Sequence, residues 1–253
     1  NQQEVTKVII RQSKLRWPIT ENMSQLIENK TLIGVERRGK YLLLLFNHGT
    51  ALIHLGMSGS IRIVEATSIT KKHDHFDIIF NNGKILRYND PRKFGAFLWA
   101  GADPYQHRLL VNLGVEPLDN DFDADSIYKA SRNRKIAIKQ FIMDAHQVVG
   151  VGNIYANESL FLAGIDPRRQ SNRISYQRYQ RLVLVIKKVL NKAIKEGGTT
   201  LKDFSQVDGK PGYFAQSLNV YCRAGQHCPD CQQTLVEIRQ SGRSTVFCKQ
   251  CQT

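Results

Sequence analysis

Short runs of β-branched, aromatic and aliphatic residues fill the first half of the chain. They occupy residues 5–10, 41–46, 50–57, 76–80 and 84–88, and His-Gly and Asn-Gly turns separate several of them. Such runs, bounded by turn residues, are typical of strands joined by hairpins. The pattern predicts that the first half of the chain is an antiparallel β-sandwich or barrel.

The period of the hydrophobic positions changes in the second half. One apolar face with helical spacing ends at Gly197-Gly198, and it comprises Tyr179, Leu182, Val183, Ile186, Val189, Leu190 and Ala193. Shorter helices fit residues 136–144 and 153–163. The sequence therefore predicts an α+β protein of two domains, in which an antiparallel β-sandwich is followed by a helical domain.

Two glycines lie between the shorter helices, in the segment VVGVGNIYANESLF at residues 148–161. Gly150 and Gly152 allow a tight turn close to a ligand, and the free N–H groups of a helix that starts at Asn153 suit a phosphate. A dinucleotide-binding loop is excluded, because its third glycine would fall at Tyr155 and no strand leads cleanly into the segment.

Four cysteines near the end of the sequence form the pattern C-x2-C-x16-C-x2-C, which is the spacing of a structural zinc ribbon. They are Cys228, Cys231, Cys248 and Cys251. Two β-prone runs around Gly242 predict a hairpin between the pairs. The alternatives are two disulfides or cysteines that only pack, but no apolar run of membrane length occurs and we expect a reducing environment. We therefore expect one structural Zn²⁺, with Cys222 as an ordinary thiol and His227 as a neighbour of the site.

The positive charge of the chain is concentrated in its second half, and this distribution indicates which kind of molecule the protein binds. The 253 residues have a net charge of +14. Residues 130–253 carry 19 lysines and arginines against 8 acids, whereas residues 1–129 carry 17 against 14. Such a basic half beside a zinc hairpin indicates a polyanion, and the electrostatics suit nucleic acid. Between the halves, residues 116–125 contain five acids, one proline and no basic residue, which predicts a linker.

Several motifs together resemble one known family. They are HLGMSGS, RYNDPRKFGA, VVGVGNIYANESLF, GGTTLKDF, DGKPGYFAQ and the four-cysteine tail, in this order along the chain. The sequence is similar over essentially its whole length to bacterial formamidopyrimidine-DNA glycosylase. The endonuclease VIII type shares the helix–two-turn–helix and the zinc hairpin, but NDPRKFG and DGKPGYF favour the formamidopyrimidine type.

The resemblance implies a domain organisation and an activity. It implies a β-sandwich catalytic domain at residues 1–115, an acidic hinge at 116–125, a helix–two-turn–helix domain with a lesion loop at 126–221, and a zinc-finger hairpin at 222–253. In the family, DNA binds in the cleft between the two domains. The implied activity is base-excision repair, with removal of 8-oxoguanine and formamidopyrimidines from duplex DNA, followed by strand nicking through β,δ-elimination via a Schiff base.

The resemblance also assigns roles to single residues. Those implied to fill the space left by a flipped base are Met57, Arg92 and Phe94. Those implied to hold the DNA backbone are His73, Lys135 and Asn153, with His54 beside the cleft and Lys139 near the lesion. A lid at residues 199–213 would cover the flipped base, with pocket residues Thr200, Lys202 and Tyr221. Lys40 would assist β-elimination, and Arg243 would stabilise the departing phosphate, because a guanidinium keeps its proton.

One feature departs from the family pattern. The family nucleophile is an N-terminal proline followed by a glutamate, but this sequence begins NQQEVTKVII. We expect that the sequence omits a leading segment or is truncated, and that a chain starting at Asn1 lacks the nucleophile and is inactive.

Three function classes follow from these observations. The first is a bifunctional glycosylase and AP lyase for oxidised purines. The second is a catalytically incompetent lesion-binding protein, and the third is an endonuclease VIII-type glycosylase for oxidised pyrimidines. For the native protein we expect the first class: a cytoplasmic, nucleoid-associated bacterial monomer that binds double-stranded DNA and no membrane.

Overall fold

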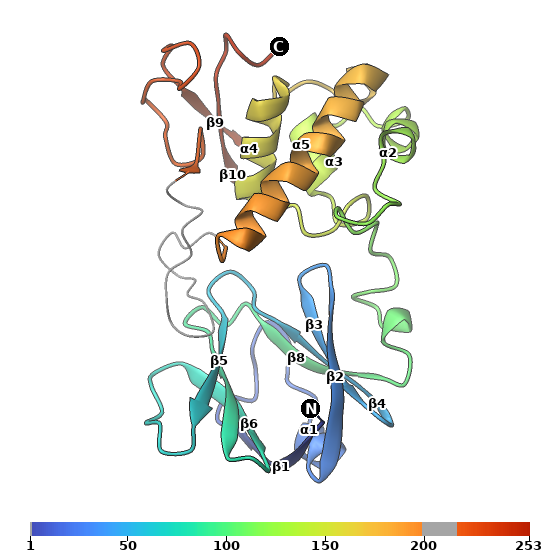
Figure 1. The fold of residues 1–253 in the computed structure, drawn as a ribbon, viewed down its shortest axis with the longest axis vertical. Coiled ribbons are helices and arrows are strands. Elements are labelled where there is room, and N and C mark those ends of the chain that lie inside the picture. The colour runs from blue at the N-terminus through green and yellow to red at the C-terminus, as the bar shows by residue number, and fades with distance from the viewer. Residues whose placement is uncertain (1, 199–216) are drawn as a thin grey trace. The chain divides into compact units, whose positions relative to one another are not determined.

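The computed structural model describes residues 2–198 and 217–253, which belong to two compact units (Figure 1). Among the described residues, the first unit comprises 2–111, and the second comprises 112–198 and 217–253. Among the described residues, none of the helices combines the length and the apolar character of a membrane-spanning segment.

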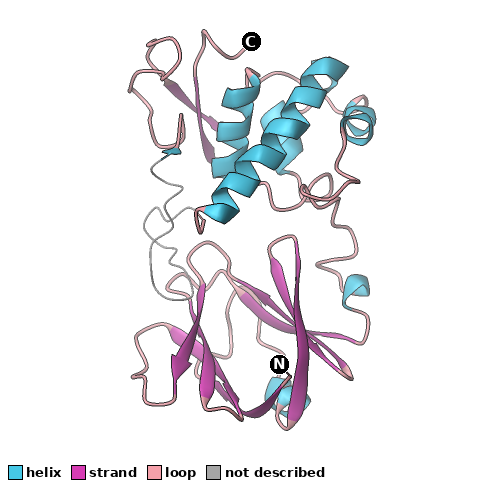
Figure 2. Ribbon diagram, in the orientation of Figure 1, coloured by secondary structure: helices cyan, strands magenta, loops and turns pink. Residues whose placement is uncertain are grey.

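The described part of the first unit is built on eight antiparallel strands (Figure 2). They are β1 (Gln3–Ile10), β2 (Lys30–Arg38), β3 (Tyr41–Phe46), β4 (Gly49–His54), β5 (Ser60–Glu65), β6 (Asp74–Phe80), β7 (Lys84–Asn89) and β8 (Ala96–Gly101). Their order in the sheet is β5-β7-β6-β1-β2-β3-β4-β8. A short helix α1 (Met23–Ile27) and a 3₁₀ turn η1 (Pro104–Gln106) complete the unit.

The sheet folds over so that its two halves pack against each other. Phe76 of β6 stacks on Phe97 of β8 with ring centroids 4.2 Å apart, although five places separate these strands in the sheet order. Both rings are fully buried in one hydrophobic core. The core also includes Val5, Val8, Met23, Leu44, Ile53, Ile78 and Tyr88. The expected antiparallel β-sandwich is confirmed.

One strand ends earlier than the hydrophobic pattern predicts. The run at residues 50–57 is mostly apolar, but β4 stops at His54 and a turn follows. Gly56 adopts a φ of +66° in this turn, a left-handed conformation that glycine accepts without strain. The turn directs Met57 out of the sheet.

The described part of the second unit contains four α-helices and a C-terminal hairpin. The helices are α2 (Ala124–Ser131), α3 (Ile138–Met143), α4 (Asn153–Ala163) and α5 (Tyr176–Lys195), with a 3₁₀ turn η2 (Ser171–Arg173) before the last. The seven residues predicted to form the apolar face of the long helix are all buried in α5. Gly150, in the turn between α3 and α4, has a φ of +80°.

Part of the acidic segment belongs to the helical unit. Phe122 is buried in the core of this unit, and the Asp123 carboxylate caps α2 by accepting a hydrogen bond from the Ser126 N–H at 2.8 Å. The acids at this end of the segment therefore start a helix, whereas the sequence predicted a linker through residue 125. The other proposed domain limits stay predictions.

The hairpin consists of β9 (Val236–Gln240) and β10 (Arg243–Phe247). Its turn residues Ser241 and Gly242 both have positive φ, 48° and 75°, which is the geometry of a type I′ turn. A small core attaches the hairpin to α4, because Phe161 packs with Val246 and the buried cysteines. The turn leaves Arg243 exposed at the first position of β10.

Candidate nucleic-acid interface and zinc centre

Two loops of the β-sandwich present large side chains to solvent. Met57, in the turn after β4, is 56 % exposed, and Phe94, in the loop between β7 and β8, is 42 % exposed. The Arg92 guanidinium lies over the Phe94 ring at 4.7 Å. The two loops touch, because a Cβ added to Gly56 would lie 2.6 Å from the Phe94 carbonyl carbon. The structure thus brings the three predicted gap-filling residues onto adjoining loops.

His54, at the end of β4, is held as a neutral ring. The Gly56 N–H donates to its Nδ1 at 2.9 Å, and the ring packs against Tyr41 at 4.8 Å. Burial, followed by the charges of Lys40 and Arg16, lowers the pKa of His54 to about 4. A neutral ring that accepts at Nδ1 carries its proton at Nε2. His54 can therefore donate one hydrogen bond to an acceptor such as a phosphate oxygen.

Two other predicted residues lie in turns of the same unit. Lys40 is exposed at the turn between β2 and β3, and its charge acts on His54. His73 has a φ of +72°, and its carbonyl accepts the Asp90 N–H at 3.1 Å. That hydrogen bond places His73 next to the loop that carries Arg92 and Phe94.

The predicted residues of the helical unit include one at a helix start and others in loops and turns. Lys135 is exposed in the loop before α3, and Asn153 is the first residue of α4. Asn153 Nδ2 donates to the Ser244 carbonyl of β10 at 3.1 Å, which brings it near Arg243. Tyr221 is half-buried. Thr200 and Lys202 lie outside the described residues, so their pocket role stays a prediction.

Lys139 is buried, although the resemblance implied a position near the lesion. Its side chain is 2 % exposed, and Nζ donates to the Ser244 carbonyl and to Thr245 Oγ1, each at 2.7 Å. Burial, with a smaller effect from the charge of Arg243, lowers the pKa of Lys139 to about 8. In the structure, the Lys139 ammonium is hydrogen-bonded to strand β10 and does not lie on the protein surface. A direct role at a lesion stays a prediction.

Sequence reasoning did not single out three buried polar side chains of these sites. Asp90 receives hydrogen bonds from both loops of the β-sandwich. Glu158 accepts the N–H groups of Asn219, Val220 and Tyr221, all at 2.8–2.9 Å. Asn157 Oδ1 accepts the Val246 N–H at 2.9 Å. All three occur within motifs that carry the resemblance, but no local pattern shows which polar residue of a motif is buried.

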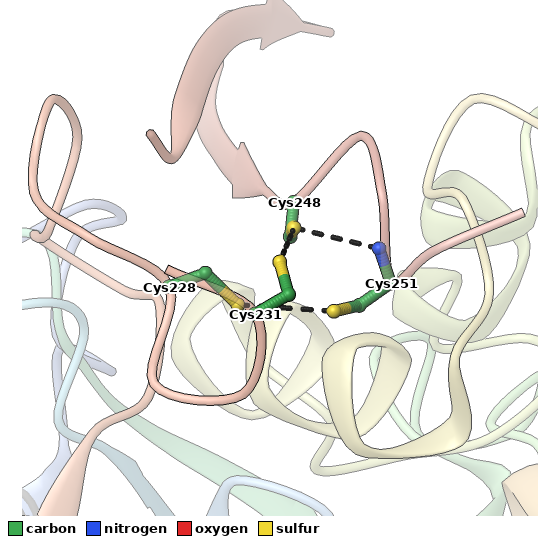
Figure 3. A group of neighbouring side chains, drawn as sticks. All are labelled: Cys228, Cys231, Cys248 and Cys251. Atoms are coloured by element: carbon green, nitrogen blue, oxygen red, sulfur yellow. Dashed lines mark hydrogen bonds between the residues drawn. The ribbon is translucent and has the colours of Figure 1, made fainter. Parts of the chain in front are cut away.

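The four predicted ligands converge at the base of the hairpin (Figure 3). Their Sγ atoms all lie within 4.8 Å of one another, and those of Cys228 and Cys251 are 3.9 Å apart. Tetrahedral zinc with Zn–S bonds of about 2.3 Å places its sulfurs roughly 3.8 Å apart. The Cys251 N–H also donates to Cys248 Sγ at 3.4 Å. The geometry and the four-thiolate donor set fit a closed structural zinc site, as predicted.

The two neighbours of the zinc site are separate from it. His227 Nδ1 lies 2.9 Å from the Gln232 carbonyl, and Cys222 is an exposed free thiol. Neither belongs to the group of four converging thiolates.

Sequence comparison agrees with this architecture. Residues 1–97 match the model described as formamidopyrimidine-DNA glycosylase N-terminal domain, and residues 113–205 match the formamidopyrimidine-DNA glycosylase H2TH domain. Residues 225–253 match a zinc finger found in FPG and IleRS. The formamidopyrimidine-DNA glycosylase of Colwellia psychrerythraea is 55 % identical over 250 residues, which are 99 % of this chain and 92 % of that protein.

The chain belongs to the formamidopyrimidine-DNA glycosylase family. Solved structures of the family share its fold. A Lactococcus lactis Fpg complex with DNA containing an abasic site has a TM-score of 0.90 and 31 % identity, and covers 99 % of this chain and 92 % of that one. A Lactococcus lactis FPG complex with DNA containing Fapy-dG has a TM-score of 0.89 and 31 % identity, with the same coverage.

The metal prediction can be tested by replacing one ligand of this formamidopyrimidine-DNA glycosylase. We expect about one zinc per chain by elemental analysis, because one four-thiolate site binds one ion. Cys248→Ser should lose the zinc, loosen the hairpin and weaken DNA binding about tenfold or more, while the β-sandwich stays folded. Cys222→Ser is the matched control and should keep both zinc and affinity. Normal DNA binding by zinc-free protein would contradict the structural role.

The protonation of His54 gives a pH prediction. Its folded pKa of about 4 lies below the ordinary value of 6.5, so the native state binds fewer protons than the unfolded state between these pH values. The stability that His54 contributes is therefore present above pH 6.5 and is lost as the pH falls towards 4.

His54→Gln keeps an acceptor for the Gly56 N–H but does not titrate. The difference in unfolding free energy between wild type and this variant should shrink by up to about 3 kcal/mol from pH 7 to pH 4, at about 1.4 kcal/mol per pKa unit. Denaturant unfolding measures the difference, and NMR titration of the ring measures the pKa. A ring midpoint above pH 6 would contradict the prediction.

Proposed function

We propose that this protein removes 8-oxoguanine and formamidopyrimidines from double-stranded DNA and then nicks the strand by β,δ-elimination. As a member of the family it is a base-excision-repair DNA glycosylase. The observation that carries the proposal is the exposed trio of Met57, Arg92 and Phe94 on two touching loops. Exposed methionine and phenylalanine side chains at loop tips suit insertion into a base stack.

The trio accounts for how a damaged base leaves the helix. A base inside the duplex is out of reach of the chemistry, so it must be flipped out and the vacancy filled. Met57 is flexible enough to fill an irregular gap, and Phe94 can wedge between base pairs. The Arg92 guanidinium offers several N–H donors to the unpaired base on the opposite strand.

The remaining predicted residues would hold the DNA backbone. His73, Lys135 and Asn153 are placed in loops or at a helix start, where phosphate contacts fix register without reading sequence. The neutral His54 would donate its Nε2 proton to a phosphate oxygen. The net +11 of residues 130–253 supports a sequence-independent electrostatic contribution. Tyr221, Thr200 and Lys202 are proposed to surround the flipped base.

The proposed chemistry needs an amine that attacks C1′. Attack breaks the glycosidic bond, and the base leaves with the bonding electrons and takes up the proton that the amine releases. The C1′–O4′ bond of the sugar ring then opens, O4′ takes up a proton, and C1′ is joined to the enzyme as a Schiff base. Loss of a C2′ proton then expels the 3′ phosphate, and a second elimination expels the 5′ phosphate. We assign Lys40 to assist the first elimination. Arg243 stabilises the charge of a departing phosphate, because its guanidinium does not give up a proton.

The substrate class separates this proposal from an endonuclease VIII-type activity. The native gene product should cleave a duplex with 8-oxoguanine opposite cytosine about tenfold faster, in kcat/KM, than one with thymine glycol, a difference of about 1.4 kcal/mol. Borohydride should trap the enzyme covalently on the 8-oxoguanine duplex. The reverse preference would favour the pyrimidine class, and binding without excision or trapping would favour a lesion-binding protein.

We propose that the protein is a cytoplasmic monomer. Sedimentation can test the oligomeric state, and cell fractionation can test the localisation.

The wedge assignment predicts a selective loss of activity. Phe94→Ala should slow excision of 8-oxoguanine about 10- to 100-fold, which is about 1.4–2.8 kcal/mol of barrier. Cleavage at a pre-formed abasic site should suffer less, because no intact base has to be extruded. Single-turnover rates on the two substrates measure the difference.

Ile69→Ala is the matched control for this experiment. Ile69 is another exposed apolar residue of the same unit, 87 % exposed, and it has no proposed role in extrusion. Its removal should leave both rates unchanged. Equal losses on both substrates in Phe94→Ala would refute the wedge.

A further inference from the structure

Asp90 lies beneath the two loops of the β-sandwich and has no exposure to solvent. Its Oδ1 accepts hydrogen bonds from Ser58 Oγ at 2.8 Å and from the Arg92 N–H at 3.2 Å. Its Oδ2 accepts from Tyr88 OH at 3.1 Å and from the Gly95 N–H at 2.9 Å. Four donors therefore converge on one carboxylate, which has about four acceptor positions.

Three of these donors lie in the segments that carry the gap-filling residues. Ser58 directly follows Met57, the Arg92 donor is its own backbone N–H, and Gly95 directly follows Phe94. One side chain thus fixes the backbone beside all three residues and joins the two loops.

The surroundings leave little room for another arrangement. A Cβ on Gly95 would lie 1.7 Å from Tyr88 OH and 2.5 Å from the His54 carbonyl oxygen. A Cβ on Gly59 would lie 2.8 Å from the same hydroxyl. Burial and the charge of Asp90 raise the pKa of Tyr88, so this hydroxyl keeps its proton and can donate. The glycines allow the loops to close around the carboxylate and the tyrosine.

A carboxylate is the side chain that satisfies this site. An amide in its place would offer one acceptor oxygen, and its NH₂ group would face two donors. Donors left without a partner in a buried site cost stability or force the loops to move. Asparagine has nearly the same shape as aspartate, so this exchange tests the hydrogen bonding with little change in packing.

We propose that Asp90 is the positioning residue that holds Met57, Arg92 and Phe94 in place before DNA binds. The inference rests on the gap-filling role given to these residues above. Preformed loops do not have to be ordered when they enter the base stack, so less binding energy is lost at that step. Asp90 does not touch the reacting atoms. Its effect falls on base extrusion and not on the chemistry at C1′.

The test compares base excision with cleavage at a pre-formed abasic site, using the native gene product. Asp90→Asn should lower the single-turnover excision rate relative to the abasic-site rate about tenfold or more. The matched control is Asp77→Asn. Asp77 is a buried carboxylate of the same unit, and it forms ion pairs with Arg11 and Arg87 rather than hydrogen bonds to the loops that carry Met57 and Phe94. Asp77→Asn should leave the ratio within about twofold of wild type at a temperature where both variants are folded.

A double-mutant cycle shows whether Asp90 acts through Phe94. If it does, Asp90→Asn should lower the ratio much less in a Phe94→Ala background than in wild type. Equal losses in the two backgrounds, or an unchanged ratio in Asp90→Asn, would overturn the proposal. Ser58→Ala removes a single donor and leaves the carboxylate in place. It should lower the ratio by a smaller factor, and it replaces Asp90→Asn in the test if that variant does not fold.

The same data separate this inference from the proposed function. If Phe94→Ala lowers the ratio and Asp90→Asn does not, the positioning role is wrong and the wedge stands. If neither variant lowers the ratio while wild type excises 8-oxoguanine, the wedge assignment is wrong and the positioning role falls with it.

Discussion

Backbone groups that are buried outside a regular hydrogen-bond ladder must find partners among side chains, and this constraint shapes both sites of the protein. The Gly95 N–H bonds the Asp90 carboxylate, and the Val246 N–H bonds the Asn157 amide oxygen. Leaving such a donor unpaired costs about 1–3 kcal/mol. A few buried polar side chains therefore determine where the loop carrying Phe94 and the strand β10 can lie.

The hairpin shows how these side chains complement the metal site. One edge of β10 pairs with β9, and on the other the Ser244 carbonyl accepts from Lys139 and Asn153. Four thiolates close the base of the hairpin, and a type I′ turn closes its tip. Arg243 thus stands on a strand that is held on both edges and at both ends. A rigid strand of this kind suits the role proposed for Arg243, because its guanidinium must lie where negative charge develops on a departing phosphate.

Helices and ligand sets that are defined by a regular local spacing of residues could be predicted from the sequence. The buried face of α5, the bounds of α4 and the four cysteines follow from local spacing. The pattern missed β2, because its apolar residues Ile33 and Val35 are exposed and charged residues fill its end. The acidic segment is the opposite case, because a linker was predicted where a helix begins. Asp123 caps that helix, and Phe122 is buried in the core of the helical unit.

The candidate site was predictable only through the resemblance. By burial habit alone, Met57 and Phe94 would be expected in the core, and the structure shows both exposed. The Lys139 side chain is the reverse case, because a lysine is expected at the surface and this one is buried. Asp90 escaped prediction because Ser58, 32 residues away in the sequence, meets it only in the folded sheet, and because nothing local shows that its carboxylate is buried among Tyr88, Arg92 and Gly95. Such networks depend on tertiary structure and leave no period in the sequence.

We infer that the loops around Asp90 and the hairpin that carries Arg243 are formed before DNA binds. Amide hydrogen exchange of the DNA-free protein, followed by NMR, measures this directly at the Gly95 and Val246 N–H groups. Both amides should exchange as slowly as those in the interior of the sheet, because each bonds a buried side chain. Exchange of either amide at the rate of an exposed loop would show that its site is not preformed and is ordered only by DNA.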